Sequence, residues 1–162
     1  MTHEIIIKEA NISVLGTRIG LAPKKQDFDA ALGGVPIRSY ATDVAGRRMY
    51  VCDDKGLSWL VKESSAAVFS MEIVLATEKA KPGMAHCYPA QPFGGIVRVG
   101  KYSVRGPISF ETAKIIEKET VPGVSLMWLP DERRVKGVII GFELNEVFAG
   151  AVKQEQHEPS DS

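Results

Sequence analysis

Three groups of residues in this sequence have types and spacings that could do chemistry. The first runs from Gly95 to Lys101 and matches the spacing GxxxxGK of a phosphate-binding loop. Such a loop needs flexible backbone around the phosphate, a Ser or Thr after the lysine to bind magnesium, and a helix that follows. Here the intervening residues have a strand pattern, and Tyr102 follows the lysine. We therefore predict a strand and a turn rather than a nucleotide site.

The second group is the adjacent pair His86 and Cys87, which could be a thiol nucleophile beside its base or two ligands of a metal ion. Adjacent side chains on an extended chain point apart, and His3 is the other histidine outside the polar C-terminal tail. The sequence also lacks further ligands at the spacing of a four-coordinate zinc site. We expect a partly buried, unreactive Cys87, and we predict no catalytic, metal-binding or cofactor-binding residues.

The third group is acidic. Asp53 and Asp54 lie in a predicted tight turn, where water keeps neighbouring carboxylates ionised and their pKa values ordinary. We therefore expect turn formers or a negative contact patch, to which Asp43 and Glu63 would add charge, rather than an acid–base pair.

Two aromatic residues, Tyr88 and Phe93, lie in a segment from Glu78 to Gly95 that is rich in proline and glycine. This segment predicts a long loop, and long loops in small domains are commonly functional. Aromatic side chains on an exposed loop are frequent anchors of protein interfaces. Tyr88 and Phe93, with the four acidic residues above, are therefore the predicted partner-binding residues.

The elements that must position these residues follow from the hydrophobic pattern. Apolar residues at helical spacing predict short helices over Pro23–Leu32 and Phe110–Glu119, the second with Ser109 as its N-cap. Alternating patterns predict a β-meander from Glu4 to Leu21 and another of about three strands between Val35 and Leu75. The other predicted strands are Ile96–Val99, Tyr102–Val104, Val124–Leu129 and Val135–Leu144. About nine short strands with two interspersed helices indicate a mainly antiparallel α+β fold.

Composition limits the possible partners and the compartment. The chain has 162 residues with 20 basic and 20 acidic side chains, so no net charge attracts it to nucleic acid or to an anionic membrane. We predict one domain over residues 1–150 and a polar, disordered tail over residues 151–162. No run approaches the roughly 18 apolar residues of a membrane-spanning helix, and the N-terminus lacks the pattern of a signal peptide. We expect a cytoplasmic protein whose two cysteines are reduced.

Three stretches in fixed order resemble a family of small bacterial proteins. They are a helix that ends Asp29-Ala30-Ala31-Leu32-Gly33-Gly34, the strand-turn-strand Tyr50-Val51-Cys52-Asp53-Asp54-Lys55-Gly56-Leu57, and Pro92-Phe93-Gly94-Gly95 before a strand that ends Val99-Gly100. The resemblance extends over Ile5 to Leu144. Members of this family look like immunity proteins encoded beside toxins of contact-dependent or type VI secretion, and the family has no established catalytic residues.

The resemblance implies a protein that binds one toxin and covers its active site. Because we expect the chain in the cytoplasm, that toxin would act there. Two alternatives remain open from the residues: a small-ligand-binding or sensory module in which the long loop closes a pocket, and an enzyme that uses His86 and Cys87. The sequence predicts no oligomeric state.

Overall fold

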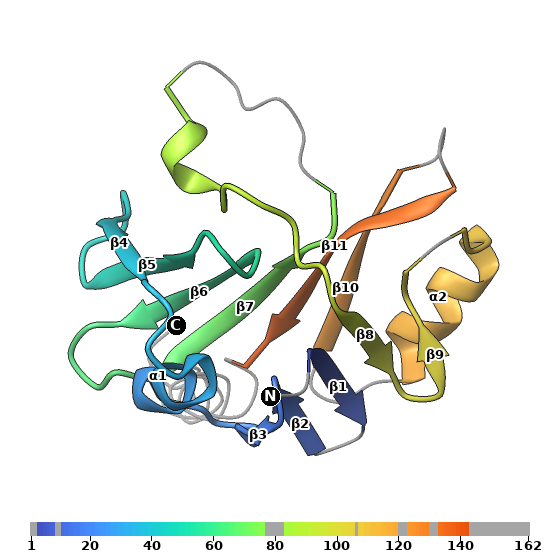
Figure 1. Cartoon of the computed structure of the whole chain (residues 1–162), viewed down its shortest axis with the longest axis horizontal. Helices are drawn as coiled ribbons and strands as arrows, with labels where there is room; N and C mark the ends of the chain where they lie inside the picture. The colour runs from blue at the N-terminus through green and yellow to red at the C-terminus, as the bar shows by residue number, and fades with distance from the viewer. Residues whose placement is uncertain are drawn as a thin grey trace, which may run out of the picture.

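The computed structural model describes residues 3–8, 11–76, 83–105, 107–119, 123–129 and 133–142 (Figure 1). Within these residues the chain forms two α-helices and eleven strands, which are arranged in two sheets. The fold is therefore α+β and mainly antiparallel, as predicted, with more strands than the expected nine. The predicted C-terminal tail lies outside the described residues.

The first sheet has five strands in the order β3-β2-β1-β8-β9. Its members are β1 (Glu4–Lys8), β2 (Asn11–Val14), β3 (Thr17–Arg18), β8 (Ile96–Val99) and β9 (Tyr102–Ser103). Strands β1, β2 and β3 form the predicted opening meander. Strands β1 and β8 pair in parallel, with Ile5 opposite Val97 and Ile7 opposite Val99. This parallel pair brings the end of the predicted long loop beside the N-terminus.

The second sheet has six strands in the order β10-β11-β7-β6-β5-β4, and all its pairs are antiparallel. Its members are β4 (Arg38–Ala41), β5 (Arg47–Cys52), β6 (Leu57–Lys62), β7 (Val68–Val74), β10 (Gly123–Leu129) and β11 (Arg134–Gly141). The predicted meander of about three strands therefore has four, because β4 joins its edge. Arg38-Ser39-Tyr40-Ala41 has no buried apolar alternation, which explains why the pattern did not predict it.

The inner faces of both sheets contribute to one hydrophobic core. Side chains alternate across each strand, so every second residue of β1, β2 and β8 is buried against the second sheet. Trp59 is fully buried and stacks with two other aromatic rings, 5.1 Å from the Phe28 ring and 6.2 Å from the Tyr50 ring. Burial of aromatic surface of this size is a large share of the stability of a small domain.

The helices close this core. In α1 (Lys25–Leu32) the buried residues Phe28, Ala31 and Leu32 follow the helical spacing, and the helix ends at Gly33, whose φ of 57° is left-handed. In α2 (Phe110–Glu119) the Ser109 hydroxyl accepts the Thr112 N–H at 3.1 Å, which confirms the predicted N-cap. Among the described residues, no helix is long and apolar enough to cross a membrane.

The described part of the predicted long loop, residues 83–95, contains a short 3₁₀ turn, η1 (Ala85–Cys87). In Figure 1 this yellow-green segment leaves η1, runs beside the second sheet and enters β8. It therefore connects the two sheets and carries two predicted partner-binding residues, Tyr88 and Phe93, as well as His86 and Cys87.

Candidate functional site

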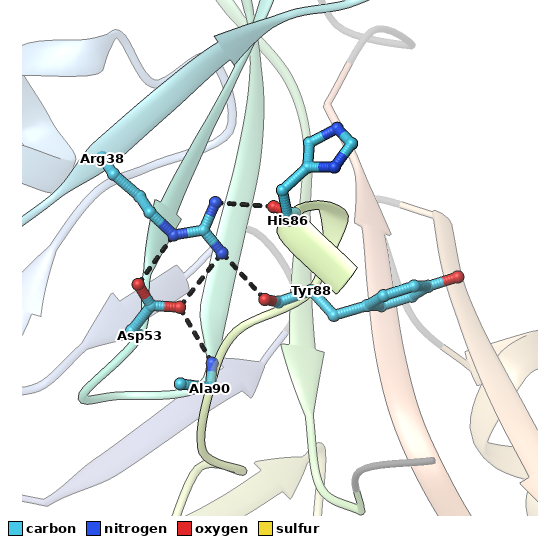
Figure 2. A network of polar contacts seen from close by, with 5 residues as sticks. All are labelled: Arg38, Asp53, His86, Tyr88 and Ala90. Carbon is cyan, nitrogen blue, oxygen red and sulfur yellow. Dashed lines mark hydrogen bonds and ion pairs between the residues drawn. The ribbon is translucent and has the colours of Figure 1, made fainter. Parts of the chain in front are cut away.

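Residues 83–91, which contain η1, are called here the η1 segment. Arg38 holds this segment against the second sheet (Figure 2). Its Nη1 donates to the carbonyl oxygen of His86 at 2.6 Å, and its Nη2 donates to the carbonyl oxygen of Tyr88 at 2.9 Å. The same guanidinium forms a two-point ion pair with Asp53, with Nε to Oδ2 at 2.7 Å and Nη2 to Oδ1 at 3.1 Å. One side chain thus joins β4, the turn after β5 and the loop.

Asp53 completes the network from the opposite side. Its Oδ1 also accepts the backbone N–H of Ala90 at 2.8 Å. The hydrogen bond from Arg38 lowers the pKa of the Asp53 carboxyl below its ordinary value, against a smaller opposing effect of burial. Asp53 was predicted to be a solvated turn residue with an ordinary pKa, and this is corrected: the carboxylate is engaged by a strand and a loop that are distant in sequence.

The end of the loop is fixed by backbone contacts around Phe93. The Phe93 N–H donates to the Val74 carbonyl oxygen at 2.6 Å, and Arg105 Nη1 donates to the Phe93 carbonyl oxygen at 2.6 Å. Phe93 is fully buried, and its ring stacks on His3 at 5.1 Å. The prediction that Phe93 is an exposed interface anchor is therefore wrong in this structure, because the residue belongs to the core that joins the sheets.

Gly56 allows the loop to approach the turn after β5 this closely. It has a left-handed φ of 66°, and a side chain there would meet backbone atoms of Phe93 and, at 2.8 Å, the carbonyl oxygen of Gln91. Two of the stretches that carried the family resemblance, the turn at Asp53–Gly56 and the step at Pro92–Gly95, thus pack against each other.

Between these fixed points the loop presents apolar side chains to solvent. Tyr88 is 49% exposed and Met84 is 44% exposed. In Figure 2 the Tyr88 ring points away from Arg38, whereas its carbonyl group points toward it. Three backbone polar groups of this segment, those of His86, Tyr88 and Ala90, thus bond the sheet side, while the Tyr88 and Met84 side chains are exposed.

The four acidic residues do not form one patch. Asp43 precedes β5 and Glu63 follows β6, where the Glu63 N–H donates to the Gly46 carbonyl oxygen at 2.9 Å. Asp53 and Asp54 follow β5 at its other end. Asp43 and Asp54 are exposed, and exposed Glu63 lies 3.9 Å from Arg48. Of the four, the pair after β5 is the one that lies beside the η1 segment.

His86 and Cys87 do come together. Cys87 Sγ lies 3.5 Å from Nε2 of His86, because the chain forms a 3₁₀ turn at this point rather than the extended conformation that we assumed. The Tyr40 ring meets the His86 ring edge-to-face at 5.0 Å, and the nearby Cys87 thiol helps to raise the pKa of the Tyr40 phenol. The geometric reason that we gave against this pair is therefore wrong.

A second carboxylate occupies the same face of the sheet as Arg38. The register places Arg38 opposite Val51, Val51 opposite Ser58, and Ser58 opposite Glu72, and paired residues of antiparallel strands share a face. Burial raises the pKa of the Glu72 carboxyl, and the charge of Lys136 opposes this. Burial and the contact with Cys87 also raise the pKa of the Tyr40 phenol. Groups with shifted pKa values gather more often at functional sites than elsewhere.

Sequence reasoning missed Arg38, Tyr40 and Glu72. Each lies in a β-strand with no motif around it, and the residues that it contacts are far away in the sequence. Asp53 is 15 positions from Arg38, and the Tyr88 carbonyl is 50 positions away. Backbone carbonyls have no residue identity, so no motif could have revealed these contacts. In the described part of the chain, no group of three or more His, Cys, Asp or Glu is placed to hold a metal ion.

No family model matches this chain, and no curated protein and no solved structure shows significant similarity to it.

Proposed function

We propose that this chain is a binding protein that neutralises a protein partner by covering it, and that residues 83–91 form the contact surface. The observation that carries the proposal is the Arg38 network. It fixes the loop backbone through the carbonyl groups of His86 and Tyr88, while the Tyr88 and Met84 side chains remain exposed. A preordered loop loses less conformational entropy on binding than a free one, so more of its contact energy appears as affinity.

The family resemblance supports a bacterial toxin as the partner, and the predicted cytoplasmic location supports a toxin that acts there. Exposed Asp54 lies in the turn that Asp53 ties to the loop, so the surface combines an aromatic anchor with negative charge. This combination suits a toxin whose active site is basic, as in an enzyme that acts on nucleic acid. An inhibitor of this kind needs a presented surface and no reaction of its own.

The test is direct binding to the purified product of a toxin gene adjacent to the gene for this chain. Calorimetry should give a one-to-one complex. Truncating Tyr88 to Ala should raise Kd by about 30-fold or more, since central aromatic anchors contribute about 2 kcal/mol or more. Ile96→Ala is a matched control, because Ile96 is also exposed, at 45%, but lies in β8 of the first sheet. Equal affinity of the Tyr88→Ala and Ile96→Ala variants would place the contact surface elsewhere, and absence of any complex would remove the proposal.

A small-ligand-binding module is the second candidate, and one observation favours it. Tyr40 and Glu72 both have raised pKa values and interact electrostatically on the sheet face that carries the η1 segment. A small ligand with hydrogen-bond donors could bind at this face by donating to the Tyr40 oxygen and the Glu72 carboxylate. A thermal-shift screen against a metabolite panel tests this candidate: a hit should be lost in Glu72→Ala, and a panel without a hit counts against it.

A further inference from the structure

Three side chains that can exchange protons meet where the loop touches the second sheet. Cys87 Sγ lies 3.5 Å from the His86 imidazole, and the Tyr40 phenol is close enough to the same thiol for the thiol to raise its pKa. Tyr40 comes from β4, and the other two come from η1. The proposed binding surface requires none of these contacts between side chains, so the cluster needs its own explanation.

Arg38 and Tyr40 both interact with the Cys87 thiol. Arg38 lies close enough to interact electrostatically with Cys87, and its Nη1 fixes the backbone of His86 at 2.6 Å. The Tyr40 phenol keeps its proton to high pH, because burial and the neighbouring thiol both raise its pKa. It can therefore donate a hydrogen bond to a thiolate at neutral pH. The remaining charged group that acts on Tyr40 is Glu72.

We propose that Cys87 is a nucleophilic thiol that exchanges with small disulfides, with His86 as the base that accepts its proton and Tyr40 as the donor that stabilises the thiolate. A thiolate, rather than a thiol, attacks a disulfide, so a neighbouring base and a hydrogen-bond donor both promote the reaction. Cys87 is half-buried, which leaves its sulfur accessible to a small reagent.

The exchange balances without a further reagent. The S–H bond of Cys87 breaks as His86 Nε2 takes the proton, and the S–S bond of the reagent breaks as Cys87 Sγ attacks one of its sulfurs. A new S–S bond forms between Sγ and that sulfur. The other sulfur leaves as a thiolate and takes the proton from the His86 imidazolium. The Cys87 sulfur is oxidised and the leaving sulfur is reduced.

Cys52 provides an internal comparison. It is fully buried in the core, and burial raises the pKa of its thiol, so we expect no reaction there while the protein is folded. Peptide mapping by mass spectrometry after treatment with glutathione disulfide should find one adduct, on Cys87. An adduct on Cys52 alone, or on neither thiol, would contradict the proposal.

Kinetics test the role of each neighbour. In wild-type protein the rate of reaction with the aromatic disulfide DTNB should exceed that of free cysteine by about tenfold at neutral pH and should disappear in Cys87→Ser. His86→Asn should bring the reaction rate and its pH dependence close to those of free cysteine. Tyr40→Phe should lower the reaction rate but leave the shape of its pH dependence unchanged, because His86 is still present. Unfolding curves for each variant identify any that are destabilised. A wild-type rate equal to that of free cysteine from about pH 5 to about pH 9, or a profile unchanged in folded His86→Asn, would overturn the assignment.

Discussion

Arg38 and Asp53 face each other across the edge of the second sheet, with Nε and Oδ2 2.7 Å apart and Nη2 and Oδ1 3.1 Å apart. Each partner also makes hydrogen bonds to the loop: Arg38 to the carbonyl groups of His86 and Tyr88, and Asp53 to the N–H of Ala90. Two of these five hydrogen bonds join Arg38 to Asp53, and the other three fix the same short segment at His86, Tyr88 and Ala90. The ion pair therefore determines how the loop is presented.

Removal of the guanidinium should release the loop without unfolding the domain. We expect Arg38→Ala to lower the free energy of unfolding by about 1 kcal/mol, since the ion pair is partly solvent-exposed, and to accelerate hydrogen exchange of the Ala90 amide by about tenfold. Arg38→Lys should behave similarly, because an ammonium group cannot reproduce the two-point geometry. Arg48→Ala is the control, since Arg48 lies 3.9 Å from exposed Glu63. Unchanged exchange at Ala90 in Arg38→Ala would refute this role.

The loop should also be released by acid. Because Arg38 lowers the pKa of Asp53 below 3.8 in the folded state, the contribution of this carboxylate is complete above pH 3.8. This contribution is lost as the pH falls through the lowered pKa that Asp53 has in the folded protein. NMR of the Ala90 amide during an acid titration should follow this loss, and the signal in Asp53→Asn should lack the transition. A transition that persists in Asp53→Asn would assign the acid response to another group.

The close approach at Gly56 gives a stability prediction. Gly56→Ala places a side chain against the backbone of Phe93 and strains a left-handed residue, so we expect a loss of about 3 kcal/mol or more. Gly46→Ala is matched: its φ is 81° and no atom lies within 4 Å of the added carbon, so it should lose about 1–2 kcal/mol for the backbone alone. Chemical denaturation measures both. Equal losses would mean that the loop moves aside at no cost.

Glu72 should destabilise the protein at neutral pH. Burial raises the pKa of Glu72 in the folded protein above the ordinary 4.5. The free energy of unfolding therefore declines as the pH rises from 4.5 through this raised pKa. We therefore expect Glu72→Gln to be more stable than wild type at pH 7, with the difference vanishing below pH 4.5. Glu63→Gln is the control, because the Glu63 side chain is exposed. A less stable Glu72→Gln at neutral pH would indicate that Lys136 more than compensates for burial.

The local pattern predicted the elements well, because their causes are local. Phe110–Glu119 begins after Ser109 because a hydroxyl satisfies a free N–H of its first turn, and both residues are visible in the sequence. Helix α1 buries Phe28, Ala31 and Leu32 at the expected spacing. The parallel pairing of β1 with β8 was not predictable, because nothing near Ile5 indicates a partner about ninety residues later.

The site was predicted less well, because its contacts are long-range. Phe93 was assigned to an exposed loop, yet its N–H bonds Val74 and its ring packs on His3. We predicted that the Cys87 and His86 side chains point apart, because we assumed an extended backbone. The chain forms a 3₁₀ turn there, and the two side chains are in contact. Tyr88 is exposed as expected, and its role in binding a partner stays a prediction.

Backbone order in the loop tests the central claim most directly, because the proposed contact surface must exist before any partner arrives. ¹⁵N relaxation should give order parameters near 0.85 for the amides of residues 85–88 and 90 in the wild-type protein, as for a structured backbone, and below about 0.6 in Arg38→Ala. Wild-type values already below about 0.6 would contradict the account, since the loop would then be mobile despite the Arg38 and Asp53 contacts.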